Sequence, residues 1–358
     1  MSAEAVRPAF RLHAQVDRRR RTRIYRLAFG MTLSAGLAFG FAWPISFVTP
    51  VLTAKLLTGG EILTFRKGLG VLVVLSGSLF VGTRLMMPML GYPAVYLLLT
   101  GLVLFLLFYA KASGASPILV VLLILAVTVV PMVGTISPSL AVAVTRGLLI
   151  SASIAIALVL LSTALFPDPA APGPKVESQE TAAPGEKPRA SSPRDGPTAL
   201  ALRSVVVLFP LVVVFQLFSL VEYSVVLIMA SLLALEPTFG KHLAAGRGLI
   251  VANLTAGLVA VLLYQLLVMV PSFPFFLLLM LLTGLWYGRW IFSDHVLGRL
   301  LSAGIAPLFV ILGPTLTSDV EAGEQITVRI VLIMFAVTYV ALAFGLLDRL
   351  TRGRRLAT

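Results

Sequence analysis

Long apolar runs alternate with short polar or basic segments along the whole chain. Several runs exceed the ~18 apolar residues that suggest a membrane-spanning helix. We therefore predict an all-α integral membrane protein with about twelve transmembrane helices, of which the second and the eighth are short. The predicted spans cover residues 24–43, 45–58, 68–85, 93–109, 117–136, 145–166, 200–220, 223–235, 246–270, 273–290, 300–316 and 326–347.

Composition supports a membrane protein. The chain is 58% hydrophobic and 12% charged, whereas a soluble domain has about 25% charged residues. It has no cysteine, which excludes a disulfide framework and a thiolate metal site. The three histidines, His13, His242 and His295, are scattered along the chain. We therefore predict neither a metal site nor a cofactor.

The net charge of +13 could indicate a nucleic-acid partner, but the positions of the basic residues argue against one. Most of them lie in short segments between apolar runs, as the positive-inside rule describes for cytoplasmic loops. On the predicted outer side the basic residues are Arg84, Arg146 and Arg329. We therefore expect a lipid bilayer as the surroundings, no nucleic acid, and both termini in the cytoplasm.

Polar segments divide the chain into five parts. Residues 1–24 are predicted to form a basic cytoplasmic segment; a cleaved signal peptide is the competing interpretation, but no obvious small-residue cleavage site follows. Residues 25–166 and 200–348 are predicted to be six-helix membrane repeats. Residues 167–199, rich in Pro, Ala, Ser, Gly and charge, are expected to form a disordered cytoplasmic linker, and residues 349–358 a basic cytoplasmic tail.

One apolar segment occurs twice. Pro131 and Pro138 precede Arg146 in the first copy, and Pro307 and Pro314 precede Arg329 in the second. The two prolines are seven residues apart in both copies. Small or hydroxyl residues flank the second proline each time, namely Ser137, Ser139, Gly313 and Thr315. We interpret each copy as a helix broken by prolines, followed by an arginine that begins the next span.

Further matches occur in the same order in both halves. They are the short second and eighth spans, Lys67-Gly68 with Arg247-Gly248, Tyr92-Pro93 with Phe273-Pro274, and Thr100-Gly101 with Thr283-Gly284. Together with the proline segment, these matches predict an internal duplication. Because six is an even number of spans, both copies have the same orientation, as parallel repeats do. The expected architecture is two parallel six-helix repeats.

The chain contains no P-loop, nucleophile elbow or HExxH motif, so we do not expect an enzyme. Polar groups inside a membrane usually face a pathway or a partner. Arg146 and Arg329 could converge and hold a carboxylate by paired hydrogen bonds. The alternative is that both arginines extend to lipid headgroups. The rest of the candidate substrate site is Pro138, Pro314, Ser139, Thr315 and Arg84.

Three more ionisable residues are candidates for coupling transport to protons. Lys55 lies late in the second span, where its amine could extend to the cytoplasm, and we favour that interpretation. Its partner in the second repeat is Ser231, which breaks the symmetry of the duplication. Glu222 and Glu236 flank the eighth span and could carry a proton, although carboxylates at helix ends are usually solvated.

The sequence resembles the fusaric acid resistance family of bacterial inner-membrane proteins, which includes aromatic acid exporters. The resemblance rests on residues 26–30 (RLAFG), on the corner at residues 43–52 (WPISFVTPVL) and on the repeated six-span block. It implies an inner-membrane transporter that exports aromatic or other organic anions, with proton coupling and a periplasmic membrane-fusion partner. The larger relatives have a sizeable cytosolic domain after each block, and this chain has only the linker and the tail there.

An anion channel is the alternative function, because plant malate channels share the six-span block as the resemblance implies. A membrane scaffold without transport activity is a third possibility. We favour a secondary transporter or exporter over a channel, and both over a scaffold. Saturable, gradient-dependent flux distinguishes a carrier from the ohmic current of a channel.

Overall fold

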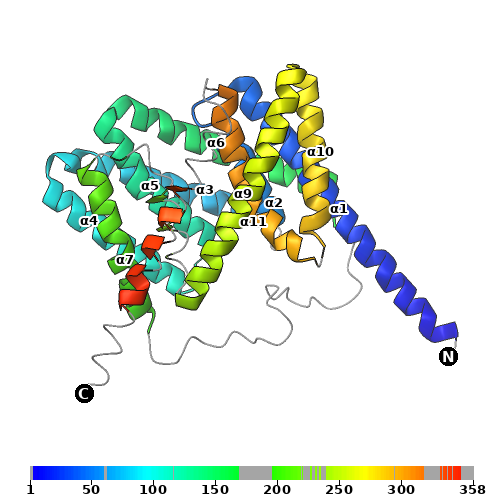
Figure 1. Cartoon of the computed structure of the whole chain (residues 1–358), viewed down its shortest axis with the longest axis horizontal. Helices are drawn as coiled ribbons and strands as arrows, with labels where there is room; N and C mark the ends of the chain where they lie inside the picture. The colour runs from blue at the N-terminus through cyan, green and yellow to red at the C-terminus, as the bar shows by residue number, and fades with distance from the viewer. Residues whose placement is uncertain are drawn as a thin grey trace. The chain divides into compact units, whose positions relative to one another are not determined.

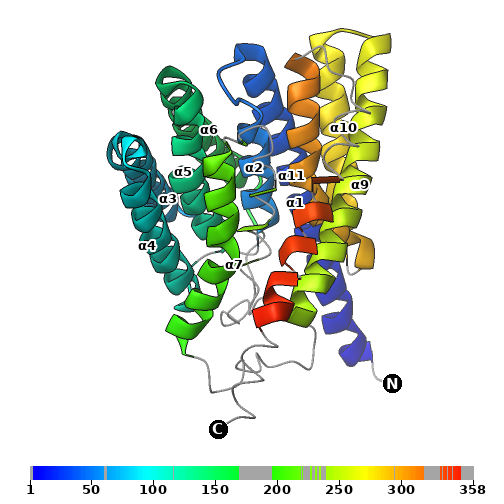
Figure 2. The ribbon, with the colours of Figure 1, turned by 60° about the vertical axis from the view of Figure 1, so that its left-hand side comes forward.

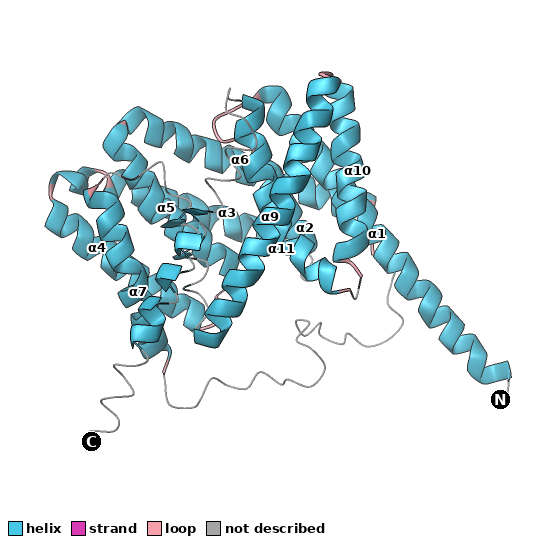
Figure 3. Ribbon diagram, in the orientation of Figure 1, coloured by secondary structure: helices cyan, strands magenta, loops and turns pink. Residues whose placement is uncertain are grey.

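The computed structural model describes residues 3–59, 63–115, 117–168, 196–218, 220, 226–227, 230–231, 234, 239–293, 295–317, and 331–347 except 333, 337 and 341. Within these ranges the chain is helical and contains no strand (Figure 3). The helices are α1 (Ala3–Phe41), α2 (Val48–Thr58), α3 (Phe65–Phe80), η1 (Val81–Met86), η2 (Pro88–Gly91), α4 (Pro93–Ala112), α5 (Pro117–Ile136), α6 (Pro138–Leu165), α7 (Pro197–Leu217), α9 (Phe239–Met269), α10 (Phe273–Ile291) and α11 (Val296–Thr317) (Figure 1).

Seven of the described helices are long and apolar enough to cross a membrane. They cover Asp17–Phe41, Phe65–Gly91, Pro93–Ala112, Pro138–Leu165, Pro197–Leu217, Val251–Met269 and Phe273–Ile291. Large apolar side chains on their surfaces are exposed; on α4 they recur at helical spacing, at Val95, Leu98, Leu102 and Leu106. An apolar stripe of this kind on a long apolar helix suits contact with lipid. The length and composition of these helices indicate an integral, multi-pass membrane protein.

The boundaries of the predicted spans agree with several helices. The predicted span 117–136 coincides with α5, and the span 273–290 differs from α10 by one residue. The span predicted to begin at residue 145 begins instead at Pro138, the first residue of α6. The eighth predicted span lies largely outside the described residues, as do the linker at 169–195 and the tail from residue 348 onward. Twelve helices therefore remain a prediction.

The prolines of the duplicated segment do not all interrupt helices. Pro131 lies inside α5, and α11 continues through Pro307 and Pro314. The chain leaves the helical conformation at Ser137, between α5 and α6. An internal proline removes one backbone hydrogen bond and bends the helix, and neighbouring groups in a membrane protein can compensate for that loss. The sequence predicts a broken helix in each copy. In the described residues this is confirmed for the first copy, which is interrupted at Ser137, and is wrong for the second, in which α11 is continuous.

The chain divides into two compact units that each contain segments from both halves of the sequence. Unit 1 comprises Met1–Gly68, Ile150–Lys187 and Ala252–Gly323. Unit 2 comprises Leu69–Leu149, Pro188–Val251 and Glu324–Thr358. Helices α3, α6 and α9 are each divided between the two units.

In unit 1, α1 packs along α10, and α2 contacts both α1 and α11 (Figure 1). The backbones of α1 and α10 approach closely at Gly284, where an added Cβ would lie 2.6 Å from Cα of Ala28. One turn later, a Cβ on Gly288 would lie 3.2 Å from Cα of Ile24. Small residues permit such approach between membrane helices, because packing and not a hydrophobic driving force holds them together. Glycine at both positions therefore allows the short distance between the two backbones at this crossing.

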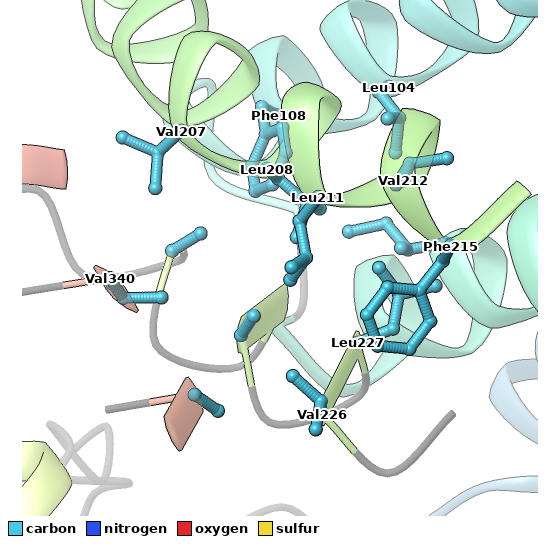
Figure 4. Close-up of a cluster of buried hydrophobic side chains, with 14 of the residues drawn as sticks. Leu104, Phe108, Val207, Leu208, Leu211, Val212, Phe215, Val226, Leu227 and Val340 are labelled. Carbon is cyan, nitrogen blue, oxygen red and sulfur yellow. The ribbon is translucent and has the colours of Figure 1, made fainter. Parts of the chain in front are cut away.

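In unit 2, the corresponding contact joins α4 to α7, which run side by side (Figures 1 and 2). A Cβ on Gly101 would lie 3.1 Å from the Phe209 ring. Leu104 and Phe108 of α4 pack with Leu208 and Leu211 of α7 in the core of this unit (Figure 4). The core also includes residues from segments 226–234 and 336–344, so later parts of the chain complete it.

Candidate functional site

The corner between α1 and α2 is held in an unusual conformation. Ala42 and Ile45 have φ angles of 46° and 53°, in the left-handed region that a β-branched residue rarely adopts. The indole Nε1 of Trp43 donates a hydrogen bond to Oγ of the buried Ser151 on α6, at 3.0 Å. Backbone strain of this kind persists where the surroundings fix it, and it is often found near functional sites.

The same corner contacts α11 at the second copy of the proline segment. A Cβ on Gly313 would lie 2.5 Å from Cβ of Phe47. Glycine before Pro314 therefore allows the corner to pack closely against α11. The small residue that the sequence analysis found beside this proline is therefore explained by packing.

Helix α2 is short and continues directly from the corner. Its 11 residues extend about 16 Å at 1.5 Å per residue, about half the hydrocarbon thickness of a bilayer. Thr49, Thr53, Ala54 and Leu57 are buried and form the face that packs against the rest of unit 1. The Thr53 hydroxyl donates to the Thr49 carbonyl at 2.9 Å, whereas the Thr49 hydroxyl has no hydrogen-bond partner among the described residues.

Lys55 lies in the last turn of α2 and contacts α11. Its Nζ donates a hydrogen bond to the backbone carbonyl of Ser302, at 2.9 Å, and its side chain is half-buried. Ser302 lies five residues before Pro307, the first proline of the second copy. The structure therefore directs the Lys55 amine to a neighbouring helix, whereas the sequence analysis favoured an amine that extends to the cytoplasm.

Arg26 forms a different kind of contact, at the end of α6. Its guanidinium is buried and donates to the carbonyl of Phe166 through both Nε and Nη2. It also pairs with Asp168, with 3.2 Å between Nη2 and Oδ1. A cation beside the last carbonyls of a helix satisfies unpaired acceptors and complements the negative end of the helix dipole. Arg26 therefore connects α1 to the end of α6 and neutralises the charge of Asp168.

Arg20 has a related role one and a half turns earlier on α1. Its Nη2 donates to the carbonyl of Arg289, at 2.9 Å, near the end of α10 at Ile291. The sequence pattern predicts that the basic N-terminal residues lie at the cytoplasmic surface, and it does not indicate these contacts. Their partners lie 269 and 140 positions away in the sequence, so no local pattern could have indicated them.

The first copy of the proline segment forms the start of α6. Ser137 precedes the helix and Pro138 is its first residue, as is common for a hydroxyl cap followed by proline. The Ser137 and Ser139 hydroxyls lie 2.8 Å apart, and Oγ of Ser137 accepts a hydrogen bond from the backbone N–H of Leu140 at 3.5 Å. Pro138 and Ser139, predicted to be substrate residues, thus have a structural role in capping α6.

Arg146 lies in the third turn of α6, and Arg84 lies in the π-helical turn η1. Both side chains are exposed, and neither forms a hydrogen bond or ion pair with the described part of the chain. A π-helical turn is frequent at functional sites, and here Gly82 in the same turn approaches the Ala126 carbonyl of α5. The exposure of Arg146 suits either a pathway or a headgroup contact.

The other predicted site residues lie wholly or partly outside the described residues. Arg329, Glu222 and Glu236 lie outside the described residues. Pro314 and Thr315 are part of α11, but their side chains are outside the described set. The convergence of Arg146 and Arg329 therefore remains a prediction. No group of three or more His, Cys, Asp or Glu residues that could hold a metal occurs in the described residues.

One family model, described as Protein of unknown function (DUF2955), matches residues 23–162. The match covers less than half of the chain and extends from α1 to the last turn of α6. No curated protein and no solved structure matches the chain. The match is to an uncharacterised family, and the resemblance to the fusaric acid resistance family remains a prediction.

Proposed function

We propose that the chain is a secondary transporter of organic anions in a bacterial inner membrane. In this proposal, twelve helices form two parallel six-helix repeats, with both termini in the cytoplasm. The single observation that supports it best is a pair of equivalent helix contacts in the two compact units. A duplicated six-helix block with parallel repeats is an architecture that many transporters share.

The first contact joins α1 to α10 in unit 1, and the second joins α7 to α4 in unit 2. If the second half repeats the first, α7 corresponds to α1 and α10 corresponds to α4. The two contacts are then equivalent, because each joins the first helix of one half to the fourth predicted helix of the other half. Each has a glycine of a Thr-Gly pair at the crossing, Gly284 in one and Gly101 in the other. The matching Thr-Gly pairs belong to the sequence and the contacts belong to the structure, so the two observations are independent.

The assignment of helices to the two units agrees with this correspondence: where a helix belongs to one unit, its proposed counterpart belongs to the other. Helix α3 begins in unit 1 and continues in unit 2, whereas its proposed counterpart α9 begins in unit 2 and continues in unit 1. Helices α4 and α5 belong to unit 2, and their counterparts α10 and α11 belong to unit 1. A duplication with a twofold relationship predicts this pattern for every pair of equivalent helices.

The polar groups favour anions as the transported class. Arg146 and, in our proposal, Arg329 contribute positive charge at the outer side of the membrane, where Arg84 adds a third guanidinium. Positive charge near a pathway attracts anions and repels cations. We propose no catalytic role, and we assign proton coupling to Glu222, Glu236 or Lys55. A periplasmic membrane-fusion protein would complete an export pathway.

Flux measurements on the purified protein in lipid vesicles test the proposal. A panel of aromatic and aliphatic carboxylates is loaded inside, and efflux is followed with and without a proton gradient. Saturable, gradient-dependent flux supports a carrier. Ohmic anion current in the same vesicles would support the channel alternative, and vesicles without any flux for the whole panel would contradict transport.

A further inference from the structure

We infer that Lys55 is an anion-binding residue, whose ammonium is positioned by the Ser302 carbonyl between α2 and α11 and receives the carboxylate of an organic monoanion. The inference rests on the proposed function for its place in a transport cycle. The binding site itself lies within unit 1 and can be tested without a transport measurement.

The position of the ammonium is fixed from two sides. Thr53, Ala54 and Leu57 are buried, so the packing of α2 holds the backbone from which Lys55 extends. At the other end of the side chain, the hydrogen bond from Nζ to the Ser302 carbonyl fixes the amine against α11. The side chain is half-buried, which leaves part of it accessible to a ligand.

The charge of Lys55 is not neutralised by the described part of unit 1. The acidic side chains described there are Asp17, which is exposed on α1, and Asp168, which is paired with Arg26. An ammonium among apolar helices requires an opposite charge or loses its proton. Lysine has three N–H donors, and the Ser302 carbonyl accepts one hydrogen bond from Nζ. A carboxylate has the charge and the acceptor atoms that the two remaining donors need.

The surroundings of Ser302 favour a cation at this point of α11. Pro307 has no backbone N–H, so it cannot donate to the carbonyl of Ala303, next to Ser302. Pro307 therefore leaves the Ala303 carbonyl without its helical donor, and the carbonyl one residue earlier, that of Ser302, accepts the hydrogen bond from Lys55. In transporters, backbone carbonyls that lack a helical donor coordinate cations. Here the cationic group belongs to the protein and can present its remaining donors to an anion.

Among the described residues, the arrangement has no equivalent at the corresponding positions of the proposed second repeat. The counterpart of Lys55 in the second half is Ser231, which is buried and donates within its own helix to the Leu227 carbonyl at 2.7 Å. The counterpart of Ser302, five residues before Pro131, is Ala126, whose carbonyl is approached by Gly82. A residue required only to pack the helices would be expected in both halves. Lysine in one half alone suits one binding site for each chain.

Binding of benzoate to the full-length protein in nanodiscs tests the inference, with uncharged benzamide as the matched ligand. Lys55→Gln should weaken benzoate binding about tenfold to a hundredfold, the range for loss of a charged hydrogen bond, and should leave benzamide binding unchanged. Lys55→Arg should retain part of the affinity. Lys111→Gln is the control variant, because Lys111 also lies in the last turn of an apolar helix, α4.

A second measurement uses the wild-type protein and avoids any effect of substitution on folding. Benzoate should slow acylation of the Lys55 amine by an amine-reactive reagent, measured by mass spectrometry, and should not slow acylation of Lys111. If wild type does not bind benzoate, or if Lys55→Gln binds it like wild type and Lys55 is not protected, the inference is wrong. If benzoate protects the Lys55 amine but vesicles show no carboxylate flux, the binding site stands and the proposed transport is refuted. If vesicles show flux but benzoate does not protect Lys55, transport stands and the binding site is refuted.

Discussion

Substitution of Gly284 by alanine should disrupt the crossing of α1 and α10, and the structure gives the size of the effect. The added Cβ would lie 2.6 Å from Cα of Ala28, whereas ordinary contact begins at 3.4 Å. The two helices must therefore separate locally by about 0.8 Å, the difference between these distances. Overpacking of this kind costs about 1–3 kcal/mol. Replacing glycine in a helix offsets about 0.5–1 kcal/mol of that cost.

Two matched glycines separate the steric cost from the backbone effect. Gly77 on α3 is exposed and an added Cβ would meet no atom within 4 Å, so Gly77→Ala should stabilise the protein slightly. Gly101→Ala would bring Cβ to 3.1 Å from the Phe209 ring, which can shift, so its cost should be intermediate. The difference in free energy of unfolding between Gly284→Ala and Gly77→Ala should then be about 1–3 kcal/mol.

Equilibrium unfolding in mixed detergent micelles, followed by tryptophan fluorescence, measures the free energy of unfolding of the three variants. The expected order of stability is Gly77→Ala, then Gly101→Ala, then Gly284→Ala. If Gly284→Ala is as stable as Gly77→Ala, the close contact between α1 and α10 is refuted. The main structural support for the proposed duplication would then be lost as well.

Other predictions follow from the contacts of the charged residues. Arg26→Gln should destabilise the protein by about 1.5–3 kcal/mol, because the end of α6 and Asp168 lose a charged donor; a melting temperature equal to that of wild type would contradict this. Arg146→Gln and Arg329→Gln should each weaken anion transport about tenfold to a hundredfold, with partial rescue by lysine; normal transport by both variants would make them headgroup contacts. Single cysteines introduced at positions 139 and 319 should react with an impermeant reagent from outside, and those at 180 and 241 should not; labelling of position 180 from outside would refute the topology.

The sequence predicted helix positions well where local rules determine them. The span 117–136 matched α5 at both ends because Pro117 begins the helix and the Ser137-Pro138 pair ends it. The start of α6 was misplaced because Arg146 was interpreted as the edge of the membrane. In the structure Arg146 is exposed in the third turn of a helix that begins at Pro138.

The contacts of the candidate site depend on tertiary packing that no local pattern encodes. Lys55 and Ser302 are 247 positions apart, and the hydrogen bond joins a side chain to a backbone carbonyl. A backbone acceptor can belong to any residue type, so neither propensity nor hydropathy could identify it. The sequence predicts an asymmetry at this position, because Ser231 is the predicted counterpart of Lys55 in the second half. The physical meaning of that asymmetry required the position of α11.

The assignment of helices to the two units has a consequence for how the protein is made. Unit 1 needs α10 and α11 beside α1 and α2, so the earliest helices to leave the ribosome lack their main packing partners until the second half has been inserted. The segment matched by the family model, residues 23–162, is divided between both units, so we do not expect it to fold independently. The two halves, produced as separate polypeptides, should each be degraded when expressed alone and persist when co-expressed.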